Sequence, residues 1–348
     1  MGITESLGKK NADGNPYIEA IEPSASLPGG EVRVTGRFLK PPQLARPEVS
    51  FTGVLGSLVV SSEDFLIARV PQGALSGPVT VQTNGNVSNS RELSIAQQVK
   101  ESLHPVANPA IDRDGNIYVT FSGGRGQKVP VAIYKIDSDN NHKPFLPELM
   151  NATGLAFDPQ GQLYVSSRFD GTVYRVTPNG TLSTYAEGMG VATGIAFDKE
   201  GNLYVGDRSG TIWRIAPDRQ IFVFATLEPS ISAYHLAFAP DGTLYVTGPT
   251  TSSFDCVYSV DPHGTVSVFY RGLGRPQGLA FDALGNLYVA ASLGGKRGIV
   301  RITPDKTASV VIAGHGLVGL AFSHTGVVLV TTNSVFRLAW DVPGLPLI

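Results

Sequence analysis

Residues 154–165 read GLAFDPQGQLYV, and four later segments restate this pattern as GIAFDKEGNLYV (194–205), HLAFAPDGTLYV (235–246), GLAFDALGNLYV (278–289) and GLAFSHTGVVLV (319–330). An earlier copy that matches the pattern less closely, NPAIDRDGNIYV, covers residues 108–119. The glycine in the middle of each copy recurs at intervals of 46, 40, 41, 43 and 41 residues. A nearly constant period of this size indicates that each copy belongs to one supersecondary unit. The sequence therefore predicts six such units.

The residues within a unit indicate strands rather than helices. In GQLYVSSRFDGTVYRVTPNGTLSTYAEG (161–188), short apolar runs alternate with polar positions, and Gly, Asp, Asn or Pro stands at each break. This pattern is typical of four short antiparallel strands. Four-stranded units repeated around an axis form a β-propeller, which leaves only short sheet edges exposed. We predict an all-β, six-bladed β-propeller over residues 96–344.

One alanine occupies the same place in every copy, at Ala110, Ala156, Ala196, Ala237, Ala280 and Ala321. Larger residues such as Leu155 and Phe157 flank it in the chain and point to the opposite face of the strand. Since the innermost strands crowd near the axis, we expect these small alanines to line the hub. We expect the aromatic or aliphatic residue that follows each alanine to pack between neighbouring blades.

The last copy is short, because the chain ends after the segments VVLVTT and SVFRLAW. Three strands remain for this blade, so a fourth must come from elsewhere. The segment IAQQVKESLHPVANPAID (95–112) aligns with TLSTYAEGMGVATGIAFD (181–198) at the end of another blade. We therefore expect residues 96–103, near Gln98, to supply the missing outer strand and close the ring.

The composition of the whole chain narrows the possible functions. The 348 residues include 40 Gly and 24 Pro, as expected of a turn-dense all-β protein. A net charge of -2 and a pI near 6.3 give no reason to expect nucleic acid or a membrane as partner. A single cysteine, Cys256, excludes an intrachain disulfide and a thiolate zinc cluster. The first ten residues, MGITESLGKK, are no secretory signal, so the sequence leaves the localisation unknown.

Residues 16–95 lack the repeat but keep the β character, and we expect residues 1–15 to form a disordered tail. Strands this short, with turn signals every eight to twelve residues, favour a small β-sandwich. The specific segments are the turn Pro28–Gly30, GRFL (36–39), VSFTG (49–53), Val-Pro (70–71) and GPVTVQTNG (77–85). With these segments, residues 16–95 resemble the IPT/TIG immunoglobulin-like family. That resemblance implies a spacer, docking platform or receptor part.

The repeats, with the pattern G-[LI]-A-F-D-x-x-G-x-L-Y-V, resemble NHL-repeat propellers and, more distantly, the gluconolactonase (senescence marker protein 30) superfamily. The second resemblance implies a divalent cation in the axial channel, held by side chains at the start of the innermost strands. An extracytoplasmic location is implied as well, if the chain begins at a processed or engineered start. The corresponding positions here are Ala107, Thr153, Thr193, Tyr234, Gln277 and Val318. None is a carboxylate, which calcium requires for most of its affinity. We therefore expect no metal site and no cofactor.

Two other residue types are candidates for catalysis or metal binding. The repeated Asp of the motif precedes a tight turn, where a carboxylate typically caps its own backbone, so we assign it a structural role. His235 replaces the motif glycine and follows Tyr234, which breaks the repeat rule at the channel mouth. A residue that departs from a repeat pattern indicates either a functional site or neutral sequence change. On this ground Tyr234 and His235 are the catalytic candidates.

The loops between the second and third strands carry many basic residues, among them Arg125, Lys128, Arg168, Arg208, Lys296 and Arg297. Arg271 and Arg275 join them from neighbouring turns, whereas the turns at the other end of the strands are rich in Asp. This asymmetry predicts a mildly basic mouth that attracts an anionic ligand. The alternative is that Asp serves the turns and Arg serves solubility. The predicted ligand-binding residues are Thr153, Arg168, Thr193, Asp207, Arg208, Tyr234, His235 and Gln277.

Three functions remain open. The first is a binding protein without an evident catalytic site, whose mouth takes a small anionic molecule, a glycan or a peptide. The second is a hydrolase resembling gluconolactonases, with a remodelled channel site and, in that case alone, a divalent cation. The third is RNA binding, as in some NHL propellers, which the pI and the lack of aromatic residues among the basic ones disfavour.

Overall fold

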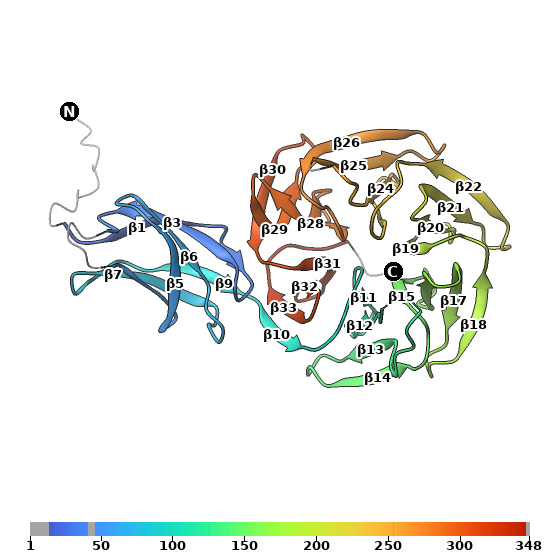
Figure 1. Cartoon of the computed structure of the whole chain (residues 1–348), viewed down its shortest axis with the longest axis horizontal. Helices are drawn as coiled ribbons and strands as arrows, with labels where there is room; N and C mark the ends of the chain where they lie inside the picture. Colours follow the sequence, from blue (N-terminus) through green and yellow to red (C-terminus); the bar gives the residue numbers. More distant parts are fainter. Residues whose placement is uncertain (1–13, 41–45, 125, 253, 346–348) are drawn as a thin grey trace, which may run out of the picture. The chain divides into compact units, whose positions relative to one another are not determined.

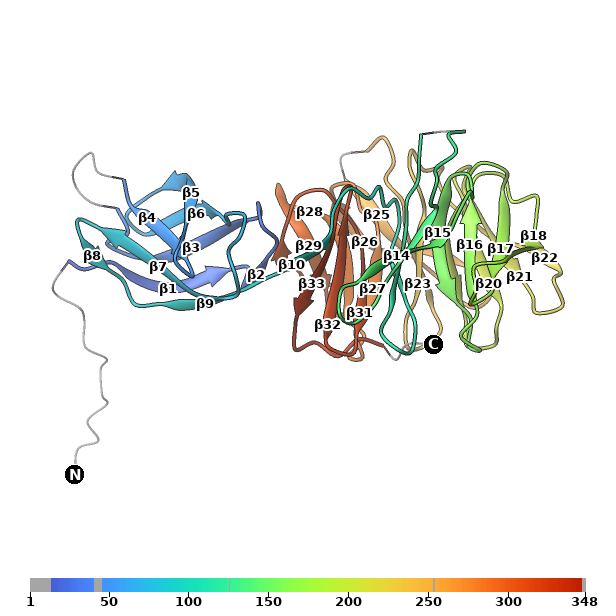
Figure 2. The same cartoon turned by 90° about the horizontal axis from the view of Figure 1, so that it is seen from below.

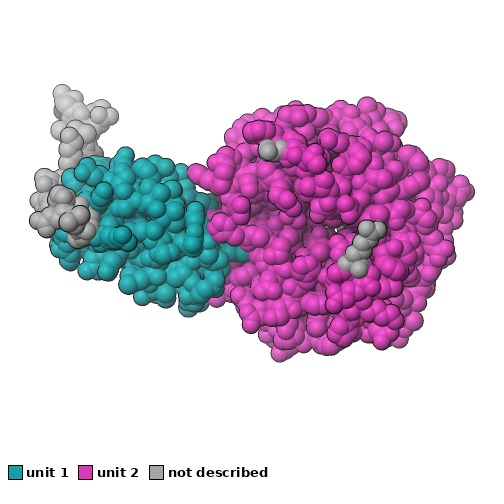
Figure 3. Space-filling view, viewed as in Figure 1, with its two compact units in different colours: residues 1–95 teal, residues 96–348 magenta. Residues whose placement is uncertain are grey.

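The structure is a computed structural model that describes residues 14–40, 46–124, 126–252 and 254–345. The basic residue Arg125 lies outside the described residues, as do residues 1–13 of the predicted tail at residues 1–15. The chain divides into two compact units, residues 1–95 and 96–348, which Figure 3 colours separately. The described residues form strands, turns and loops, and no helix among them is long and apolar enough to cross a membrane.

The first unit consists of β1 (Tyr17–Glu22), β2 (Ala25–Ser26), β3 (Glu31–Arg37), β4 (Glu48–Phe51), β5 (Val54–Ser61), β6 (Phe65–Arg69), β7 (Gly77–Thr83), β8 (Asn86–Val87) and β9 (Arg91–Ile95). Alternate residues of β3 are buried, with Val32 and Val34 on the core side, as a strand with one buried face requires. The expected immunoglobulin-like sandwich is not evident. Strand β5 pairs with both β4 and β6, so the hydrogen-bonded order is one continuous path rather than two separate sheets.

The second unit is a β-propeller (Figures 1 and 2). Four of its sheets follow the chain order: β11 (Ala110–Ile111), β12 (Ile117–Thr120), β13 (Ile133–Ile136), β14 (His142–Leu146); β15 (Ala152–Phe157), β16 (Leu163–Ser167), β17 (Thr172–Val176), β18 (Leu182–Ala186); β19 (Ala192–Phe197), β20 (Leu203–Asp207), β21 (Thr211–Ile215), β22 (Ile221–Thr226); and β23 (His235–Phe238), β24 (Leu244–Thr247), β25 (Asp255–Val260), β26 (Val266–Leu273). A fifth has the order β10-β33-β32-β31, from β10 (Gln97–Lys100), β33 (Val335–Ala339), β32 (Gly326–Thr331) and β31 (Leu317–Ser323).

The number of separate sheets differs from the prediction. The described residues form five separate four-stranded sheets, not six. Four further strands pair in sequence: β27 (Leu279–Phe281), β28 (Leu287–Leu293), β29 (Lys296–Ile302) and β30 (Ala308–Ala313). Their sheet contains more than four strands, so it is not a sixth separate sheet. The inner strands β11, β15, β19, β23, β27 and β31 each contact the next, and β31 contacts β11, so the ring of inner strands is closed.

Strand β10 belongs to the same sheet as the last three strands of the propeller. It pairs antiparallel with β33, with Gln97 opposite Arg337 and Gln98 opposite Phe336. This is the segment from which the sequence predicts an outer strand. Since β10 and β33 lie far apart in the chain, their pairing ties the beginning of the unit to its end.

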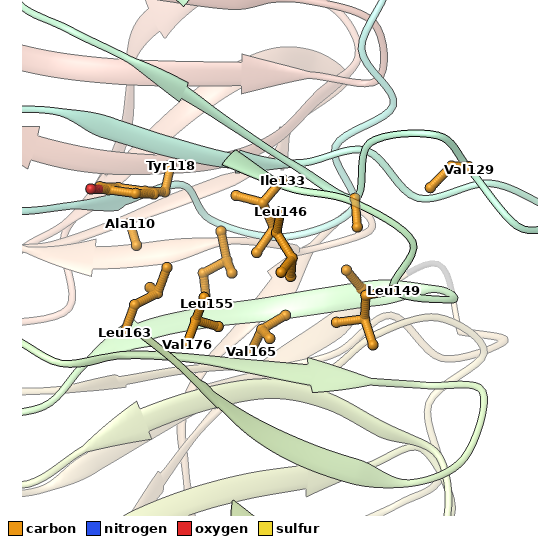
Figure 4. Packing of buried hydrophobic residues seen from close by; sticks show 12 residues of the cluster. Ala110, Tyr118, Val129, Ile133, Leu146, Leu149, Leu155, Leu163, Val165 and Val176 are labelled. Carbon is orange, nitrogen blue, oxygen red and sulfur yellow. The ribbon is translucent and has the colours of Figure 1, made fainter. Parts of the chain in front are cut away.

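Aromatic side chains hold neighbouring sheets together. The motif tyrosine of one sheet meets the motif phenylalanine of the next edge-to-face, as in Tyr164 with Phe197 at 4.9 Å between ring centroids and Tyr204 with Phe238 at 5.0 Å. This confirms the expectation that the residue after the motif alanine packs between sheets. Figure 4 shows such an interface, where Leu155 and Leu163 of one sheet pack with residues of the sheet before it.

The motif alanines lie on the inner strands but face a neighbouring sheet, which corrects the expectation that they line the hub. Ala156 is the cross-strand partner of Tyr164, so the two side chains share one face. That face packs against the next sheet, where Ala156 joins the cluster containing Ile195 and Phe197. A small side chain is needed there because the large tyrosine ring beside it fills the space between the sheets.

Candidate functional site

The hub is built from the first residue of each motif copy rather than from the alanines. A Cβ atom added to Gly154 would lie 2.4 Å from the carbonyl oxygen of Thr193, and one added to Gly194 would lie 2.3 Å from that of Tyr234. The inner strands thus approach too closely for a side chain at these glycines. Of the six equivalent positions, two carry side chains, Asn108 and His235.

The predicted catalytic pair is buried in the packing of the unit. His235 is 2% exposed, its Nε2 has no hydrogen-bond partner among the described residues, and burial lowers its pKa to about 4. Tyr234 is 1% exposed and donates its hydroxyl hydrogen bond to the backbone oxygen of Glu228. Burial raises the pKa of Tyr234 above its ordinary value. Both side chains are therefore neutral at pH 7, and neither lines the cavity at the mouth.

A cavity of about 260 Å³ lies where the ends of several inner strands meet. Five of the predicted ligand-binding residues line it: Thr153, Arg168, Thr193, Arg208 and Gln277. The strands explain this convergence. Thr153 and Thr193 stand near the start of inner strands β15 and β19, and the two arginines directly follow the second strands β16 and β20. Because these strands are antiparallel and equivalent, all four residues come to the same end of the sheets.

The two threonine hydroxyls are held in place by backbone groups. Thr153 Oγ1 donates to the carbonyl oxygen of Asn151 at 2.9 Å, and Thr193 Oγ1 donates to that of Gly206 at 2.7 Å. The backbone N–H of Tyr234 in turn donates to Thr193 Oγ1 at 3.1 Å. The carboxamide of Gln277 has no partner among the described residues, which leaves it available to a ligand.

The arginines give the cavity its charge. Arg168 is half-buried, and its Nη2 donates to the carbonyl oxygen of Gly123 at 3.3 Å. Burial, and secondly the nearby charge of Arg208, lower the pKa of Arg168 from its usual value. Arg275 lines the same cavity. Within the described part of the chain, none of the three guanidinium groups is in an ion pair, and no carboxylate lines the cavity.

Asp207, another predicted ligand-binding residue, does not line the cavity. Its Oδ1 accepts hydrogen bonds from the backbone N–H groups of Val191 at 2.9 Å and Ser209 at 3.2 Å, so it caps the turn after β20. The motif aspartates act similarly, since Asp198 Oδ1 accepts from the N–H of Asn202 at 2.8 Å. These hydrogen bonds support the structural role assigned to the repeated Asp.

The residues of the mouth do not fit a divalent cation. The cavity presents hydroxyl, carboxamide and guanidinium groups and a single imidazole, that of His104. Cationic side chains repel a metal ion, and hard cations prefer carboxylate oxygens. Throughout the described ranges, no group of three or more His, Cys, Asp or Glu side chains is placed to hold a metal.

Sequence reasoning missed several residues of this cavity. Ile231, Ser232 and Ala233 line it, and they come from the connection that leads into the inner strand β23. Arg275, which the sequence places in a basic turn but not among the predicted binding residues, lines the cavity too. The signal that could have found them is topological, because the connections between a fourth strand and the next first strand end on the same side as the loops between second and third strands.

Comparison with known proteins agrees with the fold. A profile of the strictosidine synthase-like N-terminal family matches residues 194–215. Among solved structures, a gluconolactonase from Xanthomonas campestris is 16% identical, covers 71% of this chain and 89% of its own, and has a TM-score of 0.55. No curated protein matches the chain.

Two further structures extend over most of the chain. An auxiliary nutrient binding protein from Bacteroides ovatus is 12% identical over 93% of this chain and 98% of its own, with a TM-score of 0.54. Virginiamycin B lyase from Staphylococcus aureus is 14% identical over 95% and 96%, with a TM-score of 0.52. The chain thus contains an all-β propeller whose fold is similar to that of a gluconolactonase. At these identities the likeness is one of fold.

Proposed function

We propose that the propeller binds a small anionic molecule in the cavity at its mouth. The observation that carries this proposal is the presence of Arg168, Arg208 and Arg275 around one cavity, without an ion pair or a lining carboxylate among the described residues. A guanidinium group that is partly removed from water gains from a carboxylate or phosphate partner, because charge-assisted hydrogen bonds are stronger than neutral ones. The removal of the Arg168 guanidinium group from water also lowers the pKa of Arg168.

The other residues of the cavity suit such a ligand. Thr153 and Thr193 hold ordered hydroxyl oxygens, and the carboxamide of Gln277 can both donate and accept. A cavity of about 260 Å³ accommodates a small organic acid or one acidic unit of a glycan or peptide. In this arrangement the arginines bind the anionic group, and the neutral polar residues orient the rest of the molecule.

The test is calorimetric titration with succinate, citrate and glucuronate, with glucose as the neutral counterpart of glucuronate. We expect glucuronate to bind and glucose not to bind under the same conditions. Replacing two of the three mouth arginines, Arg168→Gln and Arg208→Gln, should weaken binding by about tenfold or more, since hydrogen bonds to charged groups contribute about 1.5–3 kcal/mol. Lys143→Gln, which removes an exposed charge from an outer strand, is the matched control and should leave the affinity unchanged. Equal loss in the control and the double variant would refute the site.

A second candidate is a lactone hydrolase. The observation in its favour is the fold that the chain shares with a gluconolactonase and with virginiamycin B lyase. It is tested by following proton release from glucono-δ-lactone at constant pH, with and without chelator. Turnover above background that Thr193→Val abolishes would favour this function. Loss of turnover on adding chelator would additionally show that a metal binds where the described residues do not fit one.

We further propose that strands β27–β30 serve as a sixth blade. Their antiparallel order matches that of the separate sheets, and Phe281 and Tyr288 make the ring contacts of the motif, with Tyr245 at 4.9 Å and with Phe322 at 5.2 Å. For residues 16–95 the IPT/TIG-like assignment likewise remains a proposal, supported by the segments quoted above. An experimental structure at side-chain resolution tests both.

A further inference from the structure

The hairpin of β28 and β29 is longer at the mouth than the equivalent hairpins. Strands β16, β20 and β28 begin at the same place of the repeat, at Leu163, Leu203 and Leu287, but β28 has 7 residues and the other two have 5 each. Gly294 and Gly295 form its two-residue turn, both with positive φ, as a tight hairpin requires. Because the three strands begin at equivalent residues, the longer one ends farther out at the mouth.

This hairpin carries its arginine on the third strand of the sheet instead of the second. In β16 and β20 the residue directly after the strand is Arg168 or Arg208, and the equivalent residue of β28 is Ser292. Arg297 of β29 is the cross-strand partner of Ser292, so the two side chains share one face. The cation that the other two sheets place after their second strand is thus present here, one strand farther from the axis.

A second cavity, of about 350 Å³, lies beside this hairpin. Ser292 and Arg297 line it, and we call it the hairpin cavity. Arg275 and Gln277 line it as well, and both also line the mouth cavity of about 260 Å³. The two cavities therefore adjoin at Arg275 and Gln277.

Backbone hydrogen bonds fix the walls of the hairpin cavity. The N–H of Gly274 donates to the carbonyl oxygen of Ser292 at 2.8 Å, and the N–H of Ser292 donates to that of Gly274 at 2.9 Å. On the other side of the hairpin, the N–H of Gly314 donates to the carbonyl oxygen of Arg297 at 3.1 Å. Three separate segments of the chain are thereby joined, so the cavity does not depend on the conformation of a single loop.

Arg275, where the two cavities adjoin, has an unusual backbone conformation. Its φ is +48°, in the left-handed region that residues other than glycine rarely adopt. Such conformations persist only where the surrounding structure maintains them, and they cluster at ligand sites. Here the hydrogen bonds of Gly274 precede Arg275, and the N–H of Gln277 donates to the carbonyl oxygen of Ala290 at 2.9 Å after it. Both ends of this segment are thus held against β28.

The positive charge of the hairpin cavity is not balanced by the chain. Within the ranges that the structure describes, neither Arg275 nor Arg297 is in an ion pair, and no carboxylate lines either cavity. Beside the guanidinium groups, the hairpin cavity offers the hydroxyl of Ser292 and the carboxamide of Gln277, which both donate and accept hydrogen bonds. Hydroxyl groups of a sugar suit these neutral partners, and a carboxylate suits the arginines.

We propose that the mouth binds two linked acidic sugar units, the first in the mouth cavity and the second in the hairpin cavity. Arg168 and Arg208 bind the carboxylate of the first unit. Arg275 and Arg297 bind that of the second. The volumes of about 260 and 350 Å³ each accommodate one unit. This inference rests on the proposed anion site and names the chemical class of its ligand.

The test compares three probes by calorimetry with the full chain: glucuronate, the linked dimer diglucuronate, and glucuronosylglucose, which has the size of the dimer but a single carboxylate. We expect diglucuronate to bind about tenfold or more tightly than glucuronate, since linking makes the second contact intramolecular. It should bind about fivefold or more tightly than glucuronosylglucose, because the second carboxylate is the group that the arginines contact.

The outcomes separate this inference from the proposed function. Equal affinities of glucuronate and diglucuronate would overturn the two-unit site and leave the anion site standing. If none of the three probes binds, the anion site itself fails, and the two-unit site with it. A diglutamate peptide that binds as tightly as diglucuronate would refute the assignment to a sugar.

Variants locate the second unit. Arg297→Gln should lower the preference for diglucuronate over glucuronate about fivefold or more, because it removes one of the two guanidinium groups at the second carboxylate. Lys296→Gln is the matched control, since it removes an exposed charge from the adjacent residue, which points to the opposite face of the hairpin, and should change the preference by less than about twofold. The double replacement Arg168→Gln and Arg208→Gln should weaken the binding of both probes. An equal effect of Arg297→Gln and Lys296→Gln, or no effect of either, would contradict the placement of the second unit.

Discussion

Two of the six hub positions carry Asn108 and His235 instead of glycine, and the surroundings of these side chains explain how the fold accommodates them. Asn108 satisfies its side chain with backbone groups, since its Nδ2 donates to the carbonyl oxygen of Leu279 at 2.8 Å and its Oδ1 accepts from the N–H of Leu320 at 3.2 Å. His235 lacks such partners within the described part of the chain and is buried. The side chains of Asn108 and His235 therefore contribute to packing near the propeller axis and do not line the mouth cavity.

The buried His235 should make stability depend on acid. Its pKa is about 4 in the folded protein, against an ordinary value of 6.5, so the unfolded chain binds its proton at higher pH. The free energy of unfolding should therefore fall as the pH drops from about 7 toward 4, by about 3 kcal/mol from this residue. Urea unfolding across this range, compared with His235→Asn, isolates the effect. An identical pH dependence in both proteins would contradict it.

Gly194 should be intolerant of any side chain. A Cβ there would lie 2.3 Å from the carbonyl oxygen of Tyr234, so Gly194→Ala must push two inner strands apart. We expect a loss of about 1–3 kcal/mol in unfolding free energy, as for other overpacked positions. Gly124→Ala is the control, because the nearest atom is the end of the flexible Gln127 side chain. Thermal unfolding of the two variants measures the difference, and a Tm drop no larger for Gly194→Ala than for the control would rule out the close approach.

At the scale of elements, β10 links the beginning of the propeller unit to β33. Val99 of this strand is half-buried and packs with Leu103, Val330 and Val335. The strand is short, so its side-chain packing matters more than its few hydrogen bonds. The segment could be found from the sequence because it aligns with the end of another repeat. In a strand, the neighbouring residues Gln98 and Val99 point to opposite faces.

Placing a charge on each face of β10 tests its role. Val99→Asp puts a carboxylate against Val335 and should lower the unfolding free energy by about 2 kcal/mol or more. Gln98→Asp changes an exposed residue of the same strand and should stay within about 0.5 kcal/mol. Chemical denaturation measures both. Similar losses in the two variants would indicate that β10 has no buried face.

For the whole molecule, the closed ring of inner strands positions the residues of the mouth, since β31 contacts β11 and the cavity is lined by residues from several sheets. The shape of the mouth therefore depends on several sheets at once rather than on one of them.

The sequence by itself determined the period, the four-strand content of a repeat and the residues that converge on the mouth, because strand alternation and antiparallel order follow from local pattern. Thr153, Arg168, Thr193, Arg208 and Gln277 could be assigned to one end of the strands on that basis. Only the tertiary structure decided which side chains are buried, because burial depends on neighbouring sheets. It placed Tyr234 and His235 inside the packing and turned the alanines toward the motif tyrosines.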